Sequence, residues 1–311
     1  MTMKIVFMGT PEFAVPCLRA LAESTHEVSA VFTQPDKPKG RGYKLIPTPV
    51  KAAAQEYGIP IYQPASLKKD NDAVEAMQIL NDIAPELIVV TAYGKILPKE
   101  ILELPKYGCI NIHASLLPKY RGAAPINWVL LNGETETGVT SQQMNEGLDT
   151  GDVLVKQSTP IGENETYSQL YDRLSTMGAQ VLMQTIEAVE SGSLVPEKQD
   201  DSLSCYSPMI TKDMSALDFS KTAREVHNTI RGVTGFTTLG GKRLKIFVSE
   251  ISDKIAPGAK NGEIVDTVRF AVKCGDGRAV IFREVQPEGK KRMKTEDFLR
   301  GNKLTKGDIL G

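Results

Sequence analysis

Cysteine is scarce in this chain, and its spacing excludes two common ways of stabilising a fold. The 311 residues include only four cysteines, which are scattered widely and form no CxxC pair. Structural zinc sites and disulfide frameworks both require cysteines that recur at close spacing. We therefore expect neither a zinc site nor a set of disulfides, and we predict that no metal takes part in the function.

Long hydrophobic runs are also missing. No stretch approaches the roughly 20 apolar residues that a membrane-spanning helix requires. The amino terminus, MTMKIVFMGTPEF, has only a brief apolar run before its first glycine, which predicts that it is not a signal peptide. Hydrophobic residues make up 41% and charged residues 24% of the chain, as in an ordinary globular protein. We expect a monomeric, cytoplasmic protein with no membrane partner.

The net charge of −1 conceals an asymmetry along the chain. Residues 209–311 carry 20 Lys and Arg against 13 Asp and Glu, whereas residues 1–208 carry 17 against 25. A basic carboxyl-terminal third is typical of a surface that binds a polyanion such as nucleic acid. A solvated face is the more frequent meaning of such an excess. Charge alone leaves both interpretations open.

Strands and helices alternate through the first two thirds of the sequence. Buried strands are predicted over residues 4–8, 26–33 and 86–93, and helices separate them, including one over residues 70–83. The first strand turns into a helix without the GxGxxG fingerprint of dinucleotide-binding proteins. A long amphipathic helix over residues 166–190 has one apolar face that can cover a sheet. This order predicts an α/β fold with a doubly wound, mostly parallel sheet.

The last hundred residues have a different pattern. Residues 191–207 are polar and irregular, which predicts a linker between a first domain, residues 1–190, and a second, residues 208–311. A predicted helix at 221–231 opens the second domain. Short predicted strands follow at 243–250, 262–265, 268–274 and 279–286, separated by glycine-containing turns. This pattern indicates a small β-barrel.

Residues 109–128, CINIHASLLPKYRGAAPINW, concentrate polar chemistry between a strand and a helix. The first five residues alternate with period two, so Asn111 and His113 should project from one face. The following apolar loop is closed by Pro118, which indicates a loop shaped around a ligand. Open α/β sheets bind ligands at such carboxyl ends of strands. The alternative for His113 is a buried histidine satisfied by the backbone.

A third polar candidate is Asp149, which lies between two glycines in the turn GLDTGD. Aspartate in such a turn is often only a turn former. A histidine, an amide and a carboxylate nevertheless supply the groups for acyl transfer without a covalent intermediate. Asn111 and His113 could donate hydrogen bonds to an oxyanion while Asp149 holds the imidazole. The sequence has no competing serine or cysteine nucleophile motif.

A basic segment follows the second predicted strand. Its sequence, QPDKPKGRGYK, is broken by glycine and proline, which predicts a mobile loop. Its four cations are Lys37, Lys39, Arg41 and Lys44. These cations could contact phosphates, although a loop without function is the usual alternative.

The quoted motifs resemble a known family. NIHASLLPKYRGAAPINW, together with GLDTGD, is similar to the catalytic core of the folate-dependent formyltransferases, and the resemblance covers essentially the whole chain. The opening GTPEFAVPCL, the insertion DKPKGRG and the second domain narrow it to members that act on aminoacylated tRNA. The resemblance implies a Rossmann-like amino domain joined to an OB-like β-barrel.

The resemblance also implies roles for individual residues. Asn111, His113 and Asp149 match the family's catalytic trio. The folate-contacting positions are Tyr93, Gly94, Ser115, Leu116, Leu117 and Pro118. The implied donor is 10-formyltetrahydrofolate, and the implied acceptor is the free amino group of methionine on initiator methionyl-tRNA. The basic loop would reach the acceptor end of the tRNA, with Arg41 as the first choice.

Other members of the family could share the trio. These alternatives are a formyltetrahydrofolate hydrolase, a glycinamide ribonucleotide formyltransferase and a sugar-nucleotide formyltransferase. The basic loop and the basic second domain favour tRNA over a small acceptor. A nucleic-acid-binding protein with an inactive folate domain is the alternative from another class, and the intact trio argues against it.

The sequence departs from the family at one place. After the residues NTIR, which end at Arg231, the family usually carries a Pro-Trp-Pro segment, and this chain has GVTGFTT instead. We expect Phe236 to fill the space of the tryptophan. The departure affects packing in the second domain and contacts with tRNA, and leaves the transfer chemistry unaffected.

Overall fold

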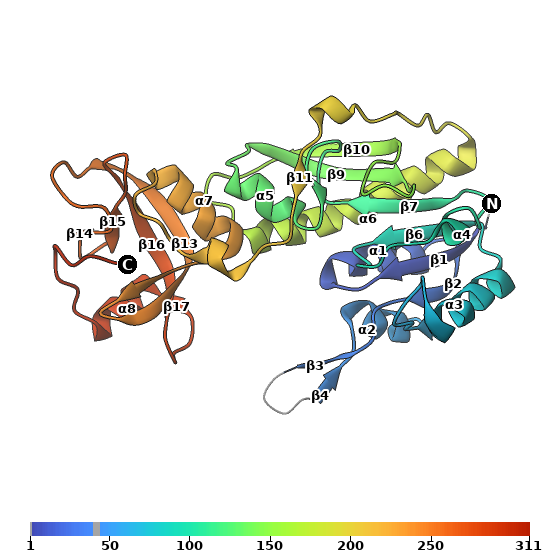
Figure 1. The fold of residues 1–311 in the computed structure, drawn as a ribbon, viewed down its shortest axis with the longest axis horizontal. Coiled ribbons are helices and arrows are strands. Elements are labelled where there is room, and N and C mark those ends of the chain that lie inside the picture. Colours follow the sequence, from blue (N-terminus) through green and yellow to red (C-terminus); the bar gives the residue numbers. More distant parts are fainter. Residues whose placement is uncertain (1, 40–43) are drawn as a thin grey trace. The chain divides into compact units, whose positions relative to one another are not determined.

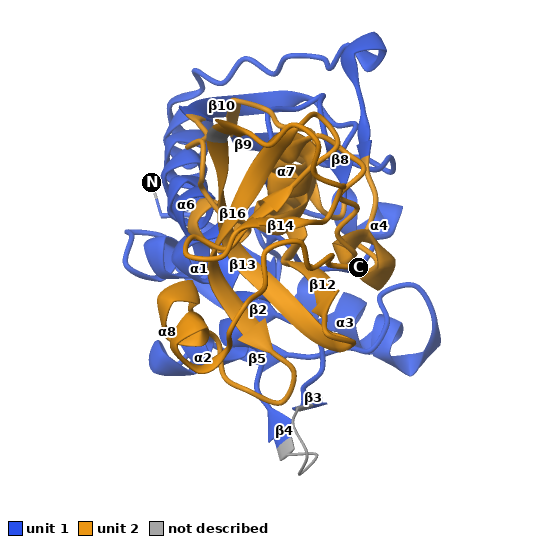
Figure 2. Ribbon diagram, turned by 90° about the vertical axis from the view of Figure 1, so that its left-hand side faces the viewer, with its two compact units in different colours: residues 1–122, 138–159, 171–206 blue, residues 123–137, 160–170, 207–311 orange. Residues whose placement is uncertain are grey.

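The computed structural model describes residues 2–39 and 44–311, and Figure 1 labels most of its helices and strands. The chain divides into two compact units, coloured separately in Figure 2. Unit 1 comprises residues 1–122, 138–159 and 171–206, and unit 2 comprises residues 123–137, 160–170 and 207–311. Both units therefore draw on more than one stretch of the sequence. The domain boundaries expected from composition, near residues 190 and 207, stay a prediction.

Unit 1 is built on a seven-stranded sheet with the order β10-β9-β7-β6-β1-β2-β5. Its strands are β1 (Lys4–Gly9), β2 (Glu27–Phe32), β5 (Ile61–Tyr62), β6 (Leu87–Thr91), β7 (Cys109–His113), β9 (Glu136–Gln143) and β10 (Val153–Pro160). The pairs β2–β5, β1–β2, β1–β6 and β6–β7 are parallel, and β7–β9 is antiparallel. The predicted doubly wound, mostly parallel sheet is confirmed.

Helices connect these strands. They are η1 (Glu12–Ala14), α1 (Val15–Ala22), α2 (Pro49–Glu56), α3 (Asp70–Ile83), α4 (Lys99–Leu102) and α6 (Tyr167–Ser191). Helix α2 begins where Thr48 accepts a hydrogen bond from the amide of Lys51, with Pro49 at the first helical position. The interior strand β1 is covered on both faces, since Ile5, Phe7 and Met8 are all fully buried. Burial on both faces explains why β1 reads as a continuous apolar run.

The described ends of the basic segment, predicted as a loop, take part in a two-stranded antiparallel ribbon. Strand β3 (Lys37–Lys39) pairs with β4 (Lys44–Ile46), and Pro38 lies opposite Leu45. A two-stranded ribbon accommodates Pro38 because each strand has one edge that needs no ladder hydrogen bond. Arg41 lies outside the described residues.

Unit 2 contains an antiparallel sheet with the order β12-β13-β16-β15-β14, and β17 pairs with β16. The strands are β12 (Gly235–Leu239), β13 (Lys242–Ile255), β14 (Ile264–Asp266), β15 (Ala271–Lys273), β16 (Arg278–Pro287) and β17 (Met293–Lys294). The helices are α5 (Pro125–Leu131), η3 (Lys212–Ser215), α7 (Ala223–Val233) and α8 (Thr295–Gly301). Two short strands, β8 (Arg121–Gly122) and β11 (Tyr206–Ser207), and a single turn, η2 (Asp201–Leu203), complete the described elements.

The expected OB-like barrel is not closed. Within the described residues, the edge strands β12 and β14 do not pair with each other. The chain's last residues link the two edges instead: the Leu310 amide donates to the Gly262 carbonyl at 2.9 Å, and the Gly311 amide to the Thr238 carbonyl at 3.4 Å. A short irregular tail here occupies the place of a closing strand.

Two features of unit 2 bear on the sequence departure. Phe236 lies on β12, is half-buried, and stacks against the Arg243 guanidinium 3.7 Å from its ring centre. The unit's core is instead centred on three aromatic rings, with Phe270 lying 5.0 Å from Phe282 and 5.9 Å from Phe298. The expectation that Phe236 fills a tryptophan's space stays a prediction.

No helix in residues 2–39 or 44–311 has the length and apolar character to cross a membrane.

Candidate active site

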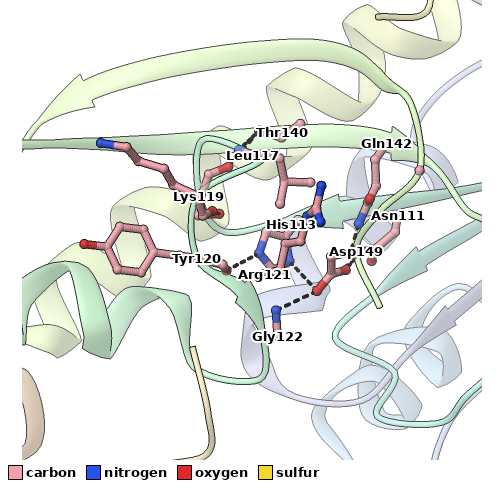
Figure 3. Close-up of polar contacts among 12 residues, drawn as sticks. Asn111, His113, Leu117, Lys119, Tyr120, Arg121, Gly122, Thr140, Gln142 and Asp149 are labelled. Atoms are coloured by element: carbon pink, nitrogen blue, oxygen red, sulfur yellow. Dashed lines mark hydrogen bonds and ion pairs between the residues drawn. The ribbon is translucent and has the colours of Figure 1, made fainter. Parts of the chain in front are cut away.

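The site begins on the polar face of two neighbouring strands, β7 and β9 (Figure 3). Their antiparallel register places Asn111 opposite Gln142 and His113 opposite Thr140. Directly opposed residues point to the same face of a sheet. Side chains alternate between the two faces along each strand, and paired residues share a face, so these four polar side chains lie together. Asn111 and His113 lie on one face, as the sequence alternation predicted.

Asp149 meets this face from the loop between β9 and β10. Its Oδ2 accepts a hydrogen bond from the Gly122 amide at 2.8 Å, and its Oδ1 accepts one from Gln142 Nε2 at 2.7 Å (Figure 3). Asn111 Nδ2 lies 3.4 Å from the same Oδ1. The structure thus brings Asn111, His113 and Asp149 together, although 38 residues separate the first from the last.

His113 has an oxygen atom beside each ring nitrogen. Its Nδ1 lies 3.6 Å from Asp149 Oδ2, and its Nε2 lies 2.9 Å from the Tyr120 carbonyl oxygen. The residue is only 6% exposed. A neutral imidazole has one N–H and satisfies one of these acceptors, whereas an imidazolium satisfies both. The backbone contact expected for a structural histidine is therefore present together with a carboxylate contact.

The loop after β7 is fixed by Thr140. The Thr140 hydroxyl donates to the Ser115 carbonyl at 2.7 Å and accepts from the Leu117 amide at 3.1 Å. Ser115 is fully buried, and its own hydroxyl donates to the Lys119 carbonyl at 2.7 Å. Leu117 is also buried, whereas Leu116 and Pro118 are half-buried. Only Leu116 and Pro118 of these four therefore expose side-chain surface to a ligand.

Tyr93 and Gly94 follow strand β6. The Tyr93 ring is 1% exposed within the core of unit 1, and burial raises the pKa of its hydroxyl above the usual range. Its carbonyl oxygen accepts hydrogen bonds from the hydroxyl of Thr10 and the amide of Gln34, both at 3.0 Å. Gly94 has φ +75°, and a Cβ there would lie 2.5 Å from Gln34 Nε2. Any ligand contact at Tyr93 must come from the backbone.

The base of the basic ribbon is anchored to the body of unit 1. Asp36 Oδ2 lies 2.6 Å from Lys51 Nζ, and its Oδ1 accepts from Gln63 Nε2 at 2.7 Å. These hydrogen bonds lower the pKa of Asp36. Lys37 is exposed, and its ammonium donates to Gln34 at 3.2 Å. The backbones of Lys39 and Lys44 face each other across the ribbon.

Several residues of the site were missed by sequence reasoning. Alternation along β9 places Thr140 and Gln142 on one face of that strand, but only the antiparallel pairing with β7 places them beside Asn111 and His113. Gln199 had no such signal. It lies in the predicted linker, yet its amide contacts the turn that carries Asp149. Among the described residues, no group of three or more His, Cys, Asp or Glu is arranged to hold a metal ion.

The arrangement combines a carboxylate, an imidazole and a carboxamide in a largely buried polar cluster. Asn111 makes only a long contact with Asp149, so its amide group can turn towards a ligand oxygen. The Gln142 Oε1 atom is buried and has no hydrogen-bond partner within the described part of the chain. A bound molecule with both an acceptor and a donor would satisfy these groups, and developing negative charge would be stabilised between Asn111 and His113.

Comparison with known proteins is consistent with this chemistry. The family model Formyl transferase matches residues 3–186, and Formyl transferase, C-terminal domain, matches residues 209–303. Methionyl-tRNA formyltransferase of Citrifermentans bemidjiense is 51% identical over 99% of this chain and 96% of its own length. The enzyme of the same name from Alkaliphilus oremlandii is 48% identical over 99% of this chain and 100% of its own length.

Solved structures share the fold at lower identity. The sugar 3N-formyl transferase WlaRD aligns over 94% of this chain and all of its own, with a TM-score of 0.69 and 23% identity. HypX from Aquifex aeolicus, solved with tetrahydrofolic acid, aligns over 96% of this chain and 47% of its own, with a TM-score of 0.62 and 16% identity. These likenesses show the shared fold, and the two family models together with the full-length relatives show that the chain belongs to the formyl transferase family.

Proposed function

We propose that the chain transfers the formyl group of 10-formyltetrahydrofolate to the free α-amino group of methionine esterified to initiator tRNA. The observation that carries this proposal is an identity of about half over essentially the full length with methionyl-tRNA formyltransferases. The polar cluster around Asp149 supports it, because a direct attack of an amine on a formyl carbon needs a donor to the formyl oxygen and no covalent enzyme intermediate.

The catalytic residues of the proposal are Asn111, His113 and Asp149. Asn111 donates its amide hydrogen bond to the formyl oxygen as negative charge develops there. His113 also donates to the formyl oxygen. To do so, it either gives up its hydrogen bond to the Tyr120 carbonyl or shares the same N–H between the two oxygens. Asp149, whose Oδ2 lies 3.6 Å from the ring Nδ1, holds the imidazole in place for this contact. The amine gives up its proton through a water molecule or through these groups as the new C–N bond forms. A proton delivered to N10 of the folate by the same route lets the bond between N10 and the formyl carbon break, so that tetrahydrofolate leaves.

The folate would lie against the loop after β7 and the end of β6. Leu116 and Pro118 offer apolar side chains to its ring system, and the backbones of Tyr93 and Gly94 offer polar groups. The unsatisfied oxygen of Gln142 fits a donor group of such a ligand. When bound, 10-formyltetrahydrofolate supplies the formyl group, and the chain contributes orientation and charge stabilisation.

The acceptor RNA would bind basic surfaces in both parts of the chain. Lys37, Lys39, Arg41 and Lys44 would reach the acceptor end. In unit 2, exposed cations gather where β13 begins and β16 ends, namely Lys242, Arg243, Lys245, Lys290, Lys291 and Arg292. We assign residues 1–190 to folate binding and catalysis and residues 208–311 to RNA binding. A monomer acting in the cytoplasm completes the proposal.

One assay tests the proposed function. The chain is incubated with 10-formyltetrahydrofolate labelled in the formyl group and with methionyl initiator tRNA, uncharged initiator tRNA, glycinamide ribonucleotide or an amino-sugar nucleotide. Label should appear in acid-stable N-formylmethionine only with the methionyl-tRNA. Label on the sugar or the ribonucleotide instead, or on no acceptor, would refute the proposal.

A further inference from the structure

The segment of residues 197–205, here called the clamp segment, lies against two loops of the candidate active site. The clamp segment and both loops belong to unit 1. Glu197 forms an antiparallel bridge with Val153, in which each amide donates to the other residue's carbonyl at 2.8 Å. This bridge aligns the clamp segment with the strand that begins directly after the Asp149 turn. Composition alone predicts an unattached linker here.

Gln199 is the central side chain of the clamp segment. Its Nε2 donates to the carbonyl oxygens of Asp149 at 2.9 Å and Gly151 at 2.6 Å. Its Oε1 accepts from Arg121, from Nε at 3.0 Å and Nη2 at 2.8 Å. Two carbonyl oxygens on one side and a guanidinium on the other fix the orientation of the Gln199 carboxamide. If the carboxamide were flipped, its oxygen would face the two carbonyl oxygens and its NH2 group would face the N–H groups of Arg121.

Arg121 carries the same network to the second loop. It stands between Tyr120, whose carbonyl contacts His113, and Gly122, whose amide binds Asp149. The clamp segment also holds the backbone of this loop: the Tyr120 amide donates to Cys205 Sγ at 3.2 Å, and the Arg121 amide to the Cys205 carbonyl at 2.9 Å. Both backbone groups that orient the His113–Asp149 pair are thus one residue from Arg121.

Arg121 has a second partner, the Asp201 carboxylate, at 2.8 Å. The side chain of Asp201 is 83% exposed, whereas that of Arg121 is 11% exposed. Water and salt screen an ion pair with such an exposed partner, so it contributes little. Gln199 is half-buried and bridges two loops at once, so of these two partners it holds Arg121 the more firmly.

The Asp149 backbone requires such support. Its φ is +53°, in the left-handed region that a residue other than glycine rarely adopts. A residue in this region costs on the order of 1 kcal/mol or more and persists only when its surroundings determine it. The hydrogen bond from Gln199 to the Asp149 carbonyl holds the backbone of Asp149 in this conformation. The direction of the Asp149 carboxylate therefore depends on the clamp segment.

We propose that Gln199, acting through Arg121 and the carbonyls of Asp149 and Gly151, is a positioning residue that holds Asp149 against His113 for formyl transfer. The inference rests on the proposed function, because formyl transfer is the reaction whose rate reports the geometry. A misplacement of about 1 Å in a catalytic group lowers a rate roughly 100-fold. Loss of the clamp should therefore lower kcat and leave folate affinity unchanged.

The test compares Gln199→Ala, Arg121→Ala, the double variant and a matched control, Gln55→Ala. Gln55 is an exposed glutamine on α2, outside the site. We expect Gln199→Ala to lower kcat roughly 10- to 100-fold with little change in the KM or Kd for 10-formyltetrahydrofolate. The double variant should be no more than about threefold slower than the worse single variant, because partners in one network are not additive.

Gln199→Glu gives a second variant if Gln199→Ala folds poorly. Its carboxylate can keep Arg121 but cannot donate to the two carbonyls. It should therefore lose kcat like Gln199→Ala while retaining the wild-type Tm within a few degrees. If either folded Gln199 variant matches the Gln55→Ala control in kcat, or loses activity only through a weaker folate Kd, the inference is wrong. If the wild-type chain does not formylate methionyl-tRNA, the proposed function itself has failed.

Discussion

At the scale of single residues, Asp149 is where the polar cluster converges. Its two oxygens face Gly122 and His113 on one side and Gln142 and Asn111 on the other. Hydrogen-bond donors therefore face both carboxylate oxygens and fix the direction of the side chain. A negative group in this position orients His113 and leaves Asn111 as the amide that can be recruited by a ligand.

Asp149→Asn tests the importance of this charge. The variant keeps the shape of the side chain but places an amide group among donors, so it both removes the charge and misorients His113. We expect kcat to fall roughly 100- to 10,000-fold. The Kd for 10-formyltetrahydrofolate, measured by calorimetry, should change less than about threefold. A variant with near-wild-type kcat would show that the carboxylate is only a turn former.

Sequence reasoning reached part of this cluster. Period two on a short strand is enough to place Asn111 and His113 on one face, because strand geometry is local. Asp149 followed from motif resemblance, since no local rule connects a turn to a strand 38 residues away. Gln142 required knowledge that β9 is antiparallel to β7, and Gln199 required the whole fold.

At the scale of elements, the turn between β9 and β10 is closely packed. A Cβ added to Gly151 would lie 1.6 Å from the carbonyl oxygen of Gln143, which is backbone and cannot move aside alone. The glycine is therefore needed for this close approach. Its carbonyl is also one of the two that Gln199 holds.

Gly151→Ala should therefore open the turn. We expect kcat to fall at least about tenfold and the free energy of unfolding to drop by about 2 kcal/mol or more. Gly301→Ala is the control, because a Cβ there meets no atom within 4 Å. Urea titrations followed by circular dichroism measure the stability of both variants, and formyl transfer assays measure kcat. Equal stabilities and activities of the two variants would contradict the described turn.

Helix α7 carries a buried histidine that makes the stability of unit 2 depend on pH. His227 is fully buried between Ser249 Oγ at 2.9 Å and the Glu163 carbonyl at 3.1 Å. Burial lowers the pKa of His227 from 6.5 to about 4. The unfolded chain therefore binds a proton more readily than the folded one between these values, so stability is lost as pH falls below about 6.5.

We expect the wild-type chain to lose about 2 kcal/mol of unfolding free energy between pH 7 and pH 5 through His227. His227→Gln removes the titrating group, so this variant should lose about 2 kcal/mol less unfolding free energy than the wild-type chain over the same pH range. Trp128 is the only tryptophan of the chain and lies on α5 in unit 2, so its fluorescence reports this unfolding. Parallel pH dependences in the two proteins would contradict the assignment.

The sequence predicted helices well where a strong helical periodicity of apolar residues was present. Helix α3 has the predicted limits, and α6 differs from its prediction by one residue at each end. The ribbon β3–β4 was missed because proline and glycine mark a break without revealing that the flanking residues pair. Strand β12 was missed because Gly235 weakens the local strand signal, and pairing along β13 overrides it.

At the scale of the whole molecule, the charge asymmetry predicts salt-dependent use of tRNA. Removing one cation that touches a phosphate should lower the steepness of log(kcat/KM) against log[salt] by about one. Arg41→Ala should weaken tRNA use and reduce this slope, with an unchanged KM for folate. The control is Lys68→Ala, which removes an exposed lysine elsewhere in unit 1. A wild-type slope for Arg41→Ala would contradict the assignment of Arg41 to RNA binding.

The sheet class and the presence of a second β unit were predictable from the order of strands and helices. The interleaving of the two units was not, because residues 123–137 and 160–170 belong to unit 2 through tertiary packing alone. The open sheet of unit 2 was not predictable either. Barrel closure depends on how distant edge strands approach, which strand spacing does not encode.

The most direct measurement is the single-turnover rate of N-formylmethionyl-tRNA formation by wild-type chain and His113→Ala, with enzyme and 10-formyltetrahydrofolate in excess over methionyl initiator tRNA. Excess enzyme removes differences in substrate affinity, so the rate reports the transfer step. The wild-type chain should form N-formylmethionine rapidly, and His113→Ala should be slower by roughly 100-fold or more while retaining folate binding. Equal rates in the two proteins would contradict a site built on Asn111, His113 and Asp149.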